Sequence, residues 1–447
     1  MPPARAGFIQ QLDIVYDVVT ERDSDGELRT ETLKLDLYRP RLTSGPAPLL
    51  VYIHGGCYVR GSKSRIPTFL KNLANSGIAV ASVDYRLAPD PLNPQATAHQ
   101  KWLFPAALKD VQQALRFLRR NKDRFLIDPA RVAAHGESAG GYLATVLGVM
   151  PVTDREGMSD GYSDRVTAVS DWYGRSDFTL PASPAGEPCH EYWLGTALTA
   201  ETKPVFQKAS LLPYVNASSV RYVQIMHGSR DPQVDIVHSV LLNEKLRAAG
   251  IKPDFYLNEG WRHGFSGSLL AEAVTRNFLL RRLGRPHPEE SVLWSLQINA
   301  GRTDTRDPDA LPAFYQVDQY MDLAAPGTPI LYQGCVDHPT LPRLYWDARY
   351  GKKFGYRFPV ANGVYRIRLH FAECRYTRIG QRRQTVGLFG IPMLRNHDTL
   401  RSTGGGFATP DLQELNVIVR NGRIDLGFAT ANGANASINA LEIERLL

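Results

Sequence analysis

The stretch AAHGESAGGYLA, residues 133–144, determines the fold that we predict for the first half of the chain. Its apolar residues before the first glycine are typical of a short buried strand, and the small apolar residues from Tyr142 onward are typical of a helix. Ser138 lies between them in the pattern Gly-x-Ser-x-Gly, where a sharp turn exposes the serine and glycines avoid clashes. Because this pattern is common, it does not by itself assign Ser138 as a nucleophile. That assignment also requires a base, an acid and an oxyanion hole elsewhere in the chain.

Strand-like and helix-like segments alternate from about residue 33 to residue 283. Continuous apolar runs such as APLLVYIHGG and IAVASVDYRL predict buried strands, and segments such as AALKDVQQALRFLRRN have apolar residues at helical spacing. This alternation predicts an α/β fold with a mostly parallel sheet that is covered on both faces.

The pattern changes after residue 290 to short runs with a period of two. Runs such as YRFPVANGVYRIRLHFAE and LNVIVRNGRIDLGFAT are divided by Asn-Gly turns, which is typical of an all-β sandwich. A stretch rich in proline and charge, residues 285–290, separates the two patterns. We therefore predict two domains, residues 1–287 and residues 288–447.

The composition of the 447 residues, 43% hydrophobic and 22% charged with a net charge of +7, is that of an ordinary globular protein. Scattered basic residues argue against a nucleic-acid partner, and no apolar run approaches the ~20 residues of a membrane span. The N-terminal residues show no hydrophobic segment of a signal peptide. No metal-site or disulfide-framework spacing relates the four cysteines, so we expect buried thiols at Cys57, Cys189, Cys335 and Cys374. The oligomeric state is not predicted.

A second motif, VYIHGGCYVRGS at residues 51–62, ends a strand in His-Gly-Gly-Cys. It resembles the HGGG-type loop whose backbone N–H groups face a developing oxyanion. By this match the donors are the amides of Gly56 and Cys57, joined by the amide of Ala139 after the nucleophile. The cysteine in place of the last glycine keeps its N–H, and its side chain must point away. His54 is expected to hold the loop and not to take part in catalysis.

The motif VDYRLAPD, residues 83–90, follows this loop, and with it residues from about 10 to 284 resemble an α/β-hydrolase esterase. The resemblance is to the hormone-sensitive-lipase-like branch, close to its bacterial carbohydrate-esterase-like members. That fold orders its triad as serine, acid, histidine. The match of IMHGSRDPQVDIVHS implies Asp231 as the acid, with Asp235 as the alternative, and EGWRHGFSG implies His263 as the base.

These residues imply ester hydrolysis without a cofactor or metal. A neutral imidazole at His263 would take the proton of Ser138 as the serine attacks an acyl carbon, and Asp231 would fix the histidine tautomer. The sequence has no GxGxxG motif, P-loop or cluster with metal-ligand spacing.

The segment from residue 179 to 215 lies where such folds carry pocket insertions. Tyr192 and Trp193 within it either line a sugar or aryl pocket or belong to the core. No long apolar cap is present, which favours a short acyl group on a bulky polar alcohol over a long-chain lipid.

Four ordered motifs of the second half, QINAGR, LYWDARYGKKFGYRFPV, GVYRIRLHFAE and INALEIE, resemble the malectin fold, a carbohydrate-binding β-sandwich. The resemblance implies sugar contacts at Tyr345 and Tyr376. Arg375 stands where the family has a second aromatic residue, and the family's acidic ligand falls near Ala434. Asn432 or Asn435 is the candidate substitute for that carboxylate. The alternative is a structural module that shapes the substrate cleft.

Together these observations predict a serine carbohydrate esterase that removes short acyl groups, above all acetyl, from plant polysaccharides or oligosaccharides. A feruloyl esterase and a glycan-binding protein with a scaffold hydrolase domain are the alternatives. The resemblance implies a secreted or periplasmic protein whose leader was removed, and a cytoplasmic protein is the alternative.

Overall fold

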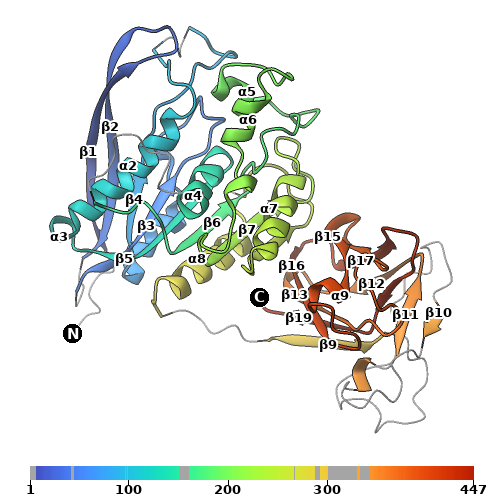
Figure 1. Ribbon diagram of the computed structural model, residues 1–447. Coiled ribbons are helices and arrows are strands. Elements are labelled where there is room, and N and C mark those ends of the chain that lie inside the picture. The colour runs from blue at the N-terminus through green and yellow to red at the C-terminus, as the bar shows by residue number, and fades with distance from the viewer. Residues whose placement is uncertain are drawn as a thin grey trace, which may run out of the picture. The chain divides into compact units, whose positions relative to one another are not determined.

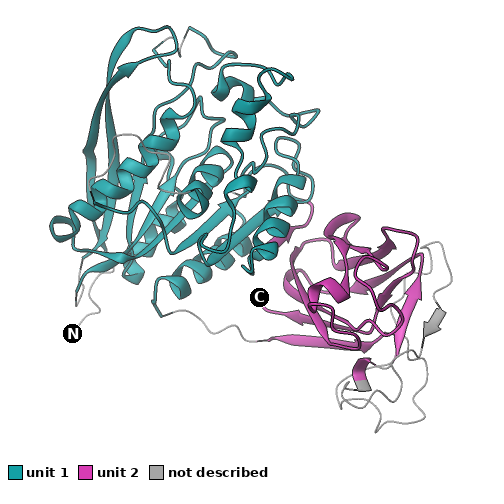
Figure 2. Cartoon of the chain, viewed as in Figure 1, with its two compact units in different colours: residues 1–255, 261–288 teal, residues 256–260, 289–447 magenta. Residues whose placement is uncertain are grey.

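The computed structural model of the protein forms two compact units, shown in different colours in Figure 2. Unit 1 comprises Met1–Phe255 and Trp261–Pro288, and unit 2 comprises Tyr256–Gly260 and Glu289–Leu447. The structure describes residues 7–41, 45–95, 97, 99–150, 161–265, 267–286, 292–300, 330–332, 343–345 and 347–447.

Unit 1 is built on a sheet whose central strands are buried on both faces (Figure 1). Every residue of β3, β4 and β6 is buried, which explains why these segments are continuous apolar runs. The strands from β3 to β7 pair in parallel, whereas β1 and β2 add an antiparallel edge. The strand order is β1-β2-β4-β3-β5-β6-β7-β8. The strands are β1 (Phe8–Arg22), β2 (Leu28–Pro40), β3 (Ala47–Ile53), β4 (Ala79–Val83), β5 (Ile127–Glu137), β6 (Ala168–Trp172), β7 (Tyr222–Gly228) and β8 (Asp254–Asn258). The last three residues of β8 are assigned to unit 2.

Helices of unit 1 bury their apolar faces against this sheet. On one face, Leu50 and Tyr52 of β3 pack in a cluster with Leu73 and Phe278. The helices are α1 (Thr68–Lys71), α2 (Ala106–Arg120), α3 (Lys122–Phe125), α4 (Ala139–Val149), α5 (Cys189–Leu194), α6 (Lys203–Ala209), α7 (Val237–Ala248) and α8 (Leu269–Arg282), with 3₁₀ turns η1 (Lys63–Arg65), η2 (Asn72–Ser76) and η4 (Leu212–Tyr214). The predicted α/β fold is confirmed.

Unit 2 consists of antiparallel strands, as the period-two pattern predicts. Along β12, Tyr356 and Phe358 are buried and Arg357 between them is exposed, because successive side chains of a strand point to opposite faces. The strand orders are β16-β13-β19-β9, β12-β17-β14-β15 and β10-β11-β18. The elements are β9 (Trp294–Asn299), β10 (Ile330–Tyr332), η6 (Arg343–Tyr345), β11 (Ala348–Gly351), β12 (Lys353–Pro359), β13 (Gly363–Phe371), β14 (Gln384–Leu388), β15 (Ile391–His397), α9 (Thr399–Ser402), β16 (Asp411–Val419), β17 (Arg423–Thr430), β18 (Ala436–Ile438) and β19 (Ala440–Arg445).

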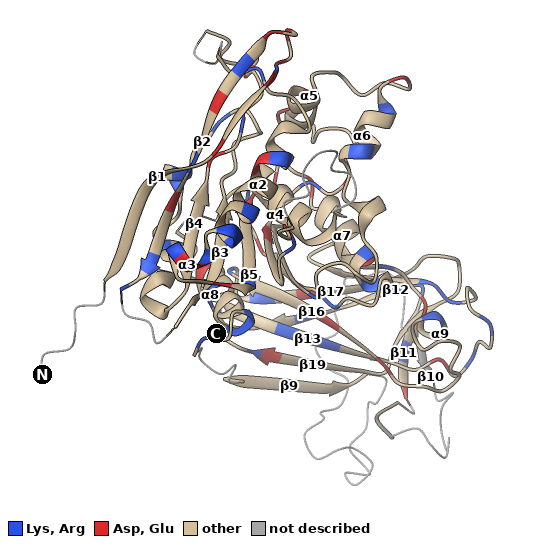
Figure 3. Cartoon of the chain, turned by 60° about the vertical axis from the view of Figure 1, so that its left-hand side comes forward, with Lys and Arg blue, Asp and Glu red and all other residues tan. Residues whose placement is uncertain are grey.

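Charged residues of both signs are interspersed along the elements of both units (Figure 3). In unit 2, Arg368 of β13 donates to Glu414 of β16 at 2.9 Å and to Glu444 of β19 at 2.6 Å. Basic side chains are thus balanced locally by acidic neighbours on the adjacent strands. Within the described ranges, no helix has the length and apolar character that crossing a membrane requires.

Candidate active site

Ser138 occupies the turn between β5 and α4, and tight packing explains the two glycines around it. Its backbone has φ 56° and ψ −120°, a conformation that L-residues rarely adopt, and its amide donates to the Trp172 carbonyl at 2.8 Å. A Cβ on Gly136 would lie 2.2 Å from the Gly140 oxygen, and a Cβ on Gly140 would lie 2.0 Å from the Ile53 oxygen. Only glycine fits either position, so the Gly-x-Ser-x-Gly pattern is a packing requirement here.

Asp231 and His263 come from the loops after β7 and β8, and their side chains form a hydrogen bond. His263 Nδ1 lies 2.7 Å from Asp231 Oδ2, and the carboxylate itself is fully buried. The other oxygen, Oδ1, accepts from the amides of Gln233 at 2.8 Å and Val234 at 3.1 Å. Burial raises the pKa of Asp231, but hydrogen bonds from His227 and His263 outweigh burial and hold that pKa below its ordinary value. An ionised Asp231 requires the proton on His263 Nδ1, which leaves Nε2 as the basic nitrogen.

One cavity of about 340 Å³ is lined by the residues that the sequence predicts for catalysis, except Asp231. Ser138 and His263 both line it, together with the three residues predicted to supply oxyanion donors, Gly56, Cys57 and Ala139. Among the described residues, none of these three amides has a hydrogen-bond acceptor. The cavity therefore contains a serine, a histidine that is 23% exposed, and backbone donors that are free to bind a ligand.

The oxyanion loop, which we define as residues 55–61, has an unusual backbone. Gly56, Cys57 and Tyr58 have successive φ values of 123°, 61° and 62°. A Cβ on Gly56 would lie 2.1 Å from the Arg60 carbonyl oxygen, so this position requires glycine. His54, at the start of the loop, is buried and stacks on Tyr85 with ring centroids 4.3 Å apart.

Residues of the motif VDYRLAPD contact His54, which precedes this loop, and helix α2. The Tyr85 hydroxyl donates to the His54 carbonyl at 3.0 Å, and the buried Arg86 guanidinium donates to the buried Asp110 carboxylate at 2.7 Å. These contacts give the motif a structural role, because they hold the segment that packs against His54 to helix α2.

The expectation of buried thiols is wrong for three of the four cysteines. Cys57 and Cys189 form a disulfide with Cα atoms 4.9 Å apart, and Cys374 is also disulfide-bonded. Cys57 and Cys189 are 132 residues apart in sequence, and the fold brings the end of β3 next to α5, so their spacing carries no signal of the pairing. Cys335 lies outside the described residues.

Several cavity residues were not predicted from the sequence. Glu137, the variable residue before Ser138, accepts from the hydroxyls of Tyr52 at 2.8 Å and Tyr173 at 2.9 Å. The only sequence feature that could have indicated a place in the cavity for Glu137 is its position next to Ser138.

His190 also lines the cavity, although it is only 1% exposed. Neither of its ring nitrogens has a hydrogen-bond partner within the part of the chain that the structure describes. Burial and the positive charge of Arg175 lower the pKa of His190 to about 3, so its ring is neutral and offers one donor and one acceptor. No sequence pattern distinguishes this histidine from others.

His227 is a second histidine near the acid. Its Nε2 lies 2.8 Å from the Val234 carbonyl and 3.4 Å from Asp231 Oδ2. Because a carbonyl only accepts, Nε2 carries a proton and also faces the carboxylate. The alternative acid, Asp235, is exposed, and its Oδ1 accepts from the Val237 amide at the start of α7.

The aromatic residues predicted for the pocket insertion do not line the cavity. Trp193 is fully buried and stacks on Tyr58 with centroids 4.2 Å apart, so the core alternative is correct for this residue. Tyr192 is half-buried and lies outside the cavity lining. The insertion contributes Glu187, Cys189 and His190 to the cavity instead.

In unit 2, Tyr345 is 7% exposed and its hydroxyl lies 2.9 Å from His370 Nδ1, which leaves little ring surface for stacking on a sugar. Tyr376 is half-buried beside Arg375 and Arg382, whose guanidinium carbons lie 5.8 and 5.2 Å from its ring centroid. The Asn432 side chain donates to the Gly380 carbonyl at 2.8 Å. The residues predicted to contact sugar therefore have protein partners of their own.

The fold of unit 1 is that of an α/β-hydrolase domain. Comparison with known families gives the same assignment: residues 35–246 match the BD-FAE model and residues 295–444 match the Malectin domain model. The predicted combination of an esterase domain and a malectin-like domain is thus confirmed.

Individual relatives match unit 1 over part of their length. Esterase LipC of Mycobacterium tuberculosis is 31% identical over 240 residues, 52% of this chain and 56% of that protein. Ethyl acetate hydrolase of Pseudomonas putida is 37% identical over 156 residues, 34% of this chain and 43% of that protein. The chain thus spans about half the length of these curated relatives. A truncated carbohydrate esterase from gut microbiota has the same fold, with a TM-score of 0.51 and 21% identity over 63% of this chain and 99% of that chain.

Proposed function

We propose that the protein is a serine carbohydrate esterase that removes short acyl groups, with acetyl as the first candidate, from polysaccharides or oligosaccharides of plant type. The observation that carries the proposal is a cavity lined by Ser138, His263 and three residues whose amides have no acceptor among the described residues, with His263 hydrogen-bonded to a buried Asp231. No other group of described residues combines a nucleophile, a base and oxyanion donors in this way.

In the proposed reaction, His263 Nε2 takes the proton of the Ser138 hydroxyl as the oxygen attacks the acyl carbon. The amides of Gly56, Cys57 and Ala139 bind the oxyanion of the tetrahedral intermediate, and one such donor contributes about 3 kcal/mol in comparable enzymes. The imidazolium then gives its proton to the departing sugar oxygen. Water, activated by the same histidine, hydrolyses the acyl-enzyme and releases the carboxylic acid.

The cavity favours a short acyl group. Its volume of about 340 Å³ is at the lower end of the roughly 300–1,000 Å³ of ligand pockets. Polar residues such as Glu187 and His190 line it beside the disulfide, and they suit the hydroxyl groups of a sugar better than a long alkyl chain. The likeness to a carbohydrate esterase fold and the Malectin match are consistent with a glycan substrate.

For unit 2 we propose glycan binding through the surface around Tyr376. For the location we propose a secreted or periplasmic protein, because disulfides such as Cys57–Cys189 persist in oxidising compartments.

Acetate release from acetylated xylan, pectin, mannan and xyloglucan tests the proposal, with Ser138→Ala as the matched inactive variant. Release from one glycan by the wild type, with none by Ser138→Ala, would support it and identify the substrate. Ferulate release measured on the same plant cell-wall preparation separates a feruloyl esterase from an acetylesterase. Full activity of Ser138→Ala, or no hydrolysis of either a glycan or an aryl acetate by the wild type, would contradict the proposal.

A further inference from the structure

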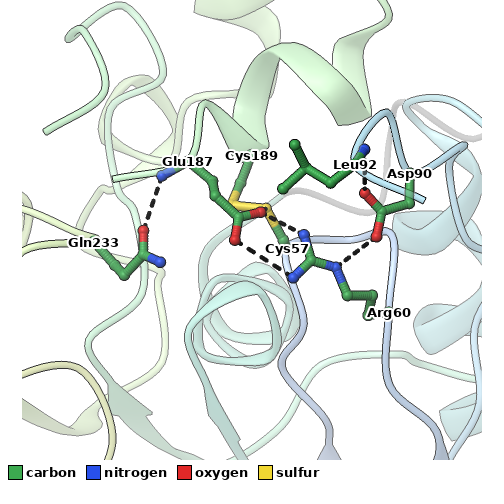
Figure 4. The surroundings of a disulfide bond; sticks show 7 residues. All are labelled: Cys57, Arg60, Asp90, Leu92, Glu187, Cys189 and Gln233. Carbon is green, nitrogen blue, oxygen red and sulfur yellow. Dashed lines mark hydrogen bonds and ion pairs between the residues drawn. A yellow bond between two sulfur atoms is a disulfide. The ribbon is translucent and has the colours of Figure 1, made fainter. Parts of the chain in front are cut away.

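Three different contacts link the oxyanion loop to one segment of the pocket wall, residues 187–194, which we call the α5 segment. Cys57 is joined to Cys189 by the disulfide, and the Arg60 guanidinium forms an ion pair with the Glu187 carboxylate (Figure 4). The Tyr58 ring stacks on Trp193 with an interplanar angle of 9°. Three residues of the loop, Cys57, Tyr58 and Arg60, are thus held by covalent, apolar and ionic contacts to the same short segment.

The conformation of the loop does not maintain itself. Its two internal backbone hydrogen bonds, from the amides of Val59 and Arg60, both end on the Gly56 carbonyl, at 3.1 and 2.8 Å. Cys57 and Tyr58 have positive φ values, which are strained for L-residues with a Cβ, so surrounding contacts must maintain them. Cys57 is both the site of this strain and the source of a proposed oxyanion donor.

The α5 segment is itself fixed to the loop that carries the acid. The backbone N–H of Glu187 donates to Gln233 Oε1 at 2.9 Å, and the backbone N–H of Gln233 donates to Asp231 Oδ1 at 2.8 Å. Figure 4 shows Gln233 and Arg60 on opposite sides of Glu187. Arg60 also donates to Asp90 Oδ2 at 2.7 Å. One connected set of contacts therefore joins the proposed oxyanion donors to the proposed triad.

We propose that the Cys57–Cys189 disulfide and the Arg60–Glu187 ion pair position the oxyanion amides, so that full activity requires the oxidised disulfide. This inference rests on the proposed esterase function. Oxyanion donors act only when they lie about 2.7–3.1 Å from the oxygen that they bind, so release of the loop misplaces the amides without removing them. Cys57, Arg60, Glu187 and Cys189 are positioning residues in this scheme.

The test compares the wild type with Cys189→Ser, which breaks the disulfide and leaves every oxyanion amide in the chain. For hydrolysis of p-nitrophenyl acetate we expect kcat to fall about 10- to 100-fold with a much smaller change in KM, less than the roughly 10²–10³ of a deleted donor. Inactivation by a fluorophosphonate, which depends on the same amides, should slow in parallel. Glu187→Gln, with the disulfide intact, should show a smaller loss of kcat.

Reduction of the wild type is a second route to the same state, which covers a failure of Cys189→Ser to fold. A phosphine attacks the disulfide, and water hydrolyses the resulting thiophosphonium: the water oxygen ends in the phosphine oxide and its two protons end on the two thiols. The reduced wild type should match Cys189→Ser, and the reductant should not affect Cys189→Ser further. Cys374→Ser, which removes the other disulfide-bonded cysteine, is the control and should keep wild-type kinetics on the aryl ester.

Circular dichroism and melting curves separate positioning from stability. A lower melting temperature together with unchanged kcat and inactivation rate, measured where the variant is folded, would overturn the inference and leave the disulfide as a stabilising link only. A wild type that neither hydrolyses the aryl ester nor reacts with the fluorophosphonate would instead overturn the proposed function, and the inference with it.

Discussion

Asp231→Asn is the sharpest test of the proposed triad, because the change preserves shape and alters only charge and hydrogen bonding. In the wild type, Oδ1 accepts from two backbone amides and Oδ2 faces His263 Nδ1 at 2.7 Å. The asparagine oxygen must keep the Oδ1 position to accept from those amides, so its NH₂ group faces His263. Nδ1 then becomes an acceptor, the proton moves to Nε2, and the ring can no longer take the proton of Ser138.

The expected loss is large. The same change of tautomer in a serine protease lowers kcat by about 10⁴, and we expect a loss of about 10³–10⁴ here. His227 adds to the effect. In the wild type its protonated Nε2 lies 3.4 Å from Asp231 Oδ2, and in the variant it would face the NH₂ group that takes the place of this oxygen. Two donors without an acceptor between them destabilise the loop, by about 1–3 kcal/mol for a buried group.

Steady-state hydrolysis of p-nitrophenyl acetate measures the effect, with folding checked by circular dichroism. Asp235→Asn is the matched control, since this exposed aspartate is the alternative acid and lies four residues further along the chain, before α7 begins. We expect it to keep wild-type kcat. A folded Asp231→Asn with more than about a tenth of wild-type kcat, or a strong loss in Asp235→Asn, would refute the assignment of Asp231 as the orienting acid.

Packing at the nucleophile turn predicts that Gly140→Ala unfolds or strongly destabilises the protein, because the new Cβ would lie 2.0 Å from the Ile53 oxygen; a melting curve measures this. The lowered pKa of Asp231 stabilises the folded state above the ordinary value of 3.8, and this contribution is lost as the pH falls below it. Urea unfolding between about pH 5 and 2 should therefore show a steeper loss of stability in the wild type than in Asp231→Asn. His190→Phe should lower kcat/KM for an acetylated glycan more than for an aryl acetate, because the neutral imidazole offers its bare nitrogens to sugar hydroxyls. Equal losses on both substrates would contradict that role.

The features that the sequence predicts correctly are set by local rules. The nucleophile turn is recognisable because two glycines are needed within five residues, and the structure shows which atoms exclude a side chain at each. Buried parallel strands produce continuous apolar runs, and half-exposed strands such as β12 produce alternation, so both fold classes follow from periodicity. Asp231 and His263 were assigned from short motifs in a known order, and the structure brings these two side chains together.

No local rule of this kind predicts which residues of α5 line the cavity. Whether a residue of α5 faces the cavity or the core depends on how a six-residue helix is rotated against the sheet, and its sequence of mixed aromatic and polar residues fits more than one rotation. The structure turns Trp193 into the core and His190 toward the cavity. The disulfide likewise joins positions 132 residues apart, and only the three-dimensional fold brings them together.

This difference bears on how such a site acquires specificity. In the proposed reaction the triad and the amides act on the ester carbonyl, which every ester shares, and they lie on turns at the ends of the sheet strands. The α5 segment contacts the oxyanion loop through Cys189 and Glu187 and presents His190 to the cavity. A change in this segment therefore alters both what the cavity recognises and how well the amides are aligned. For that reason we expect substitutions in the α5 segment to change kcat and substrate preference together, whereas substitutions of lining residues outside the α5 segment, the oxyanion loop and the triad change preference alone.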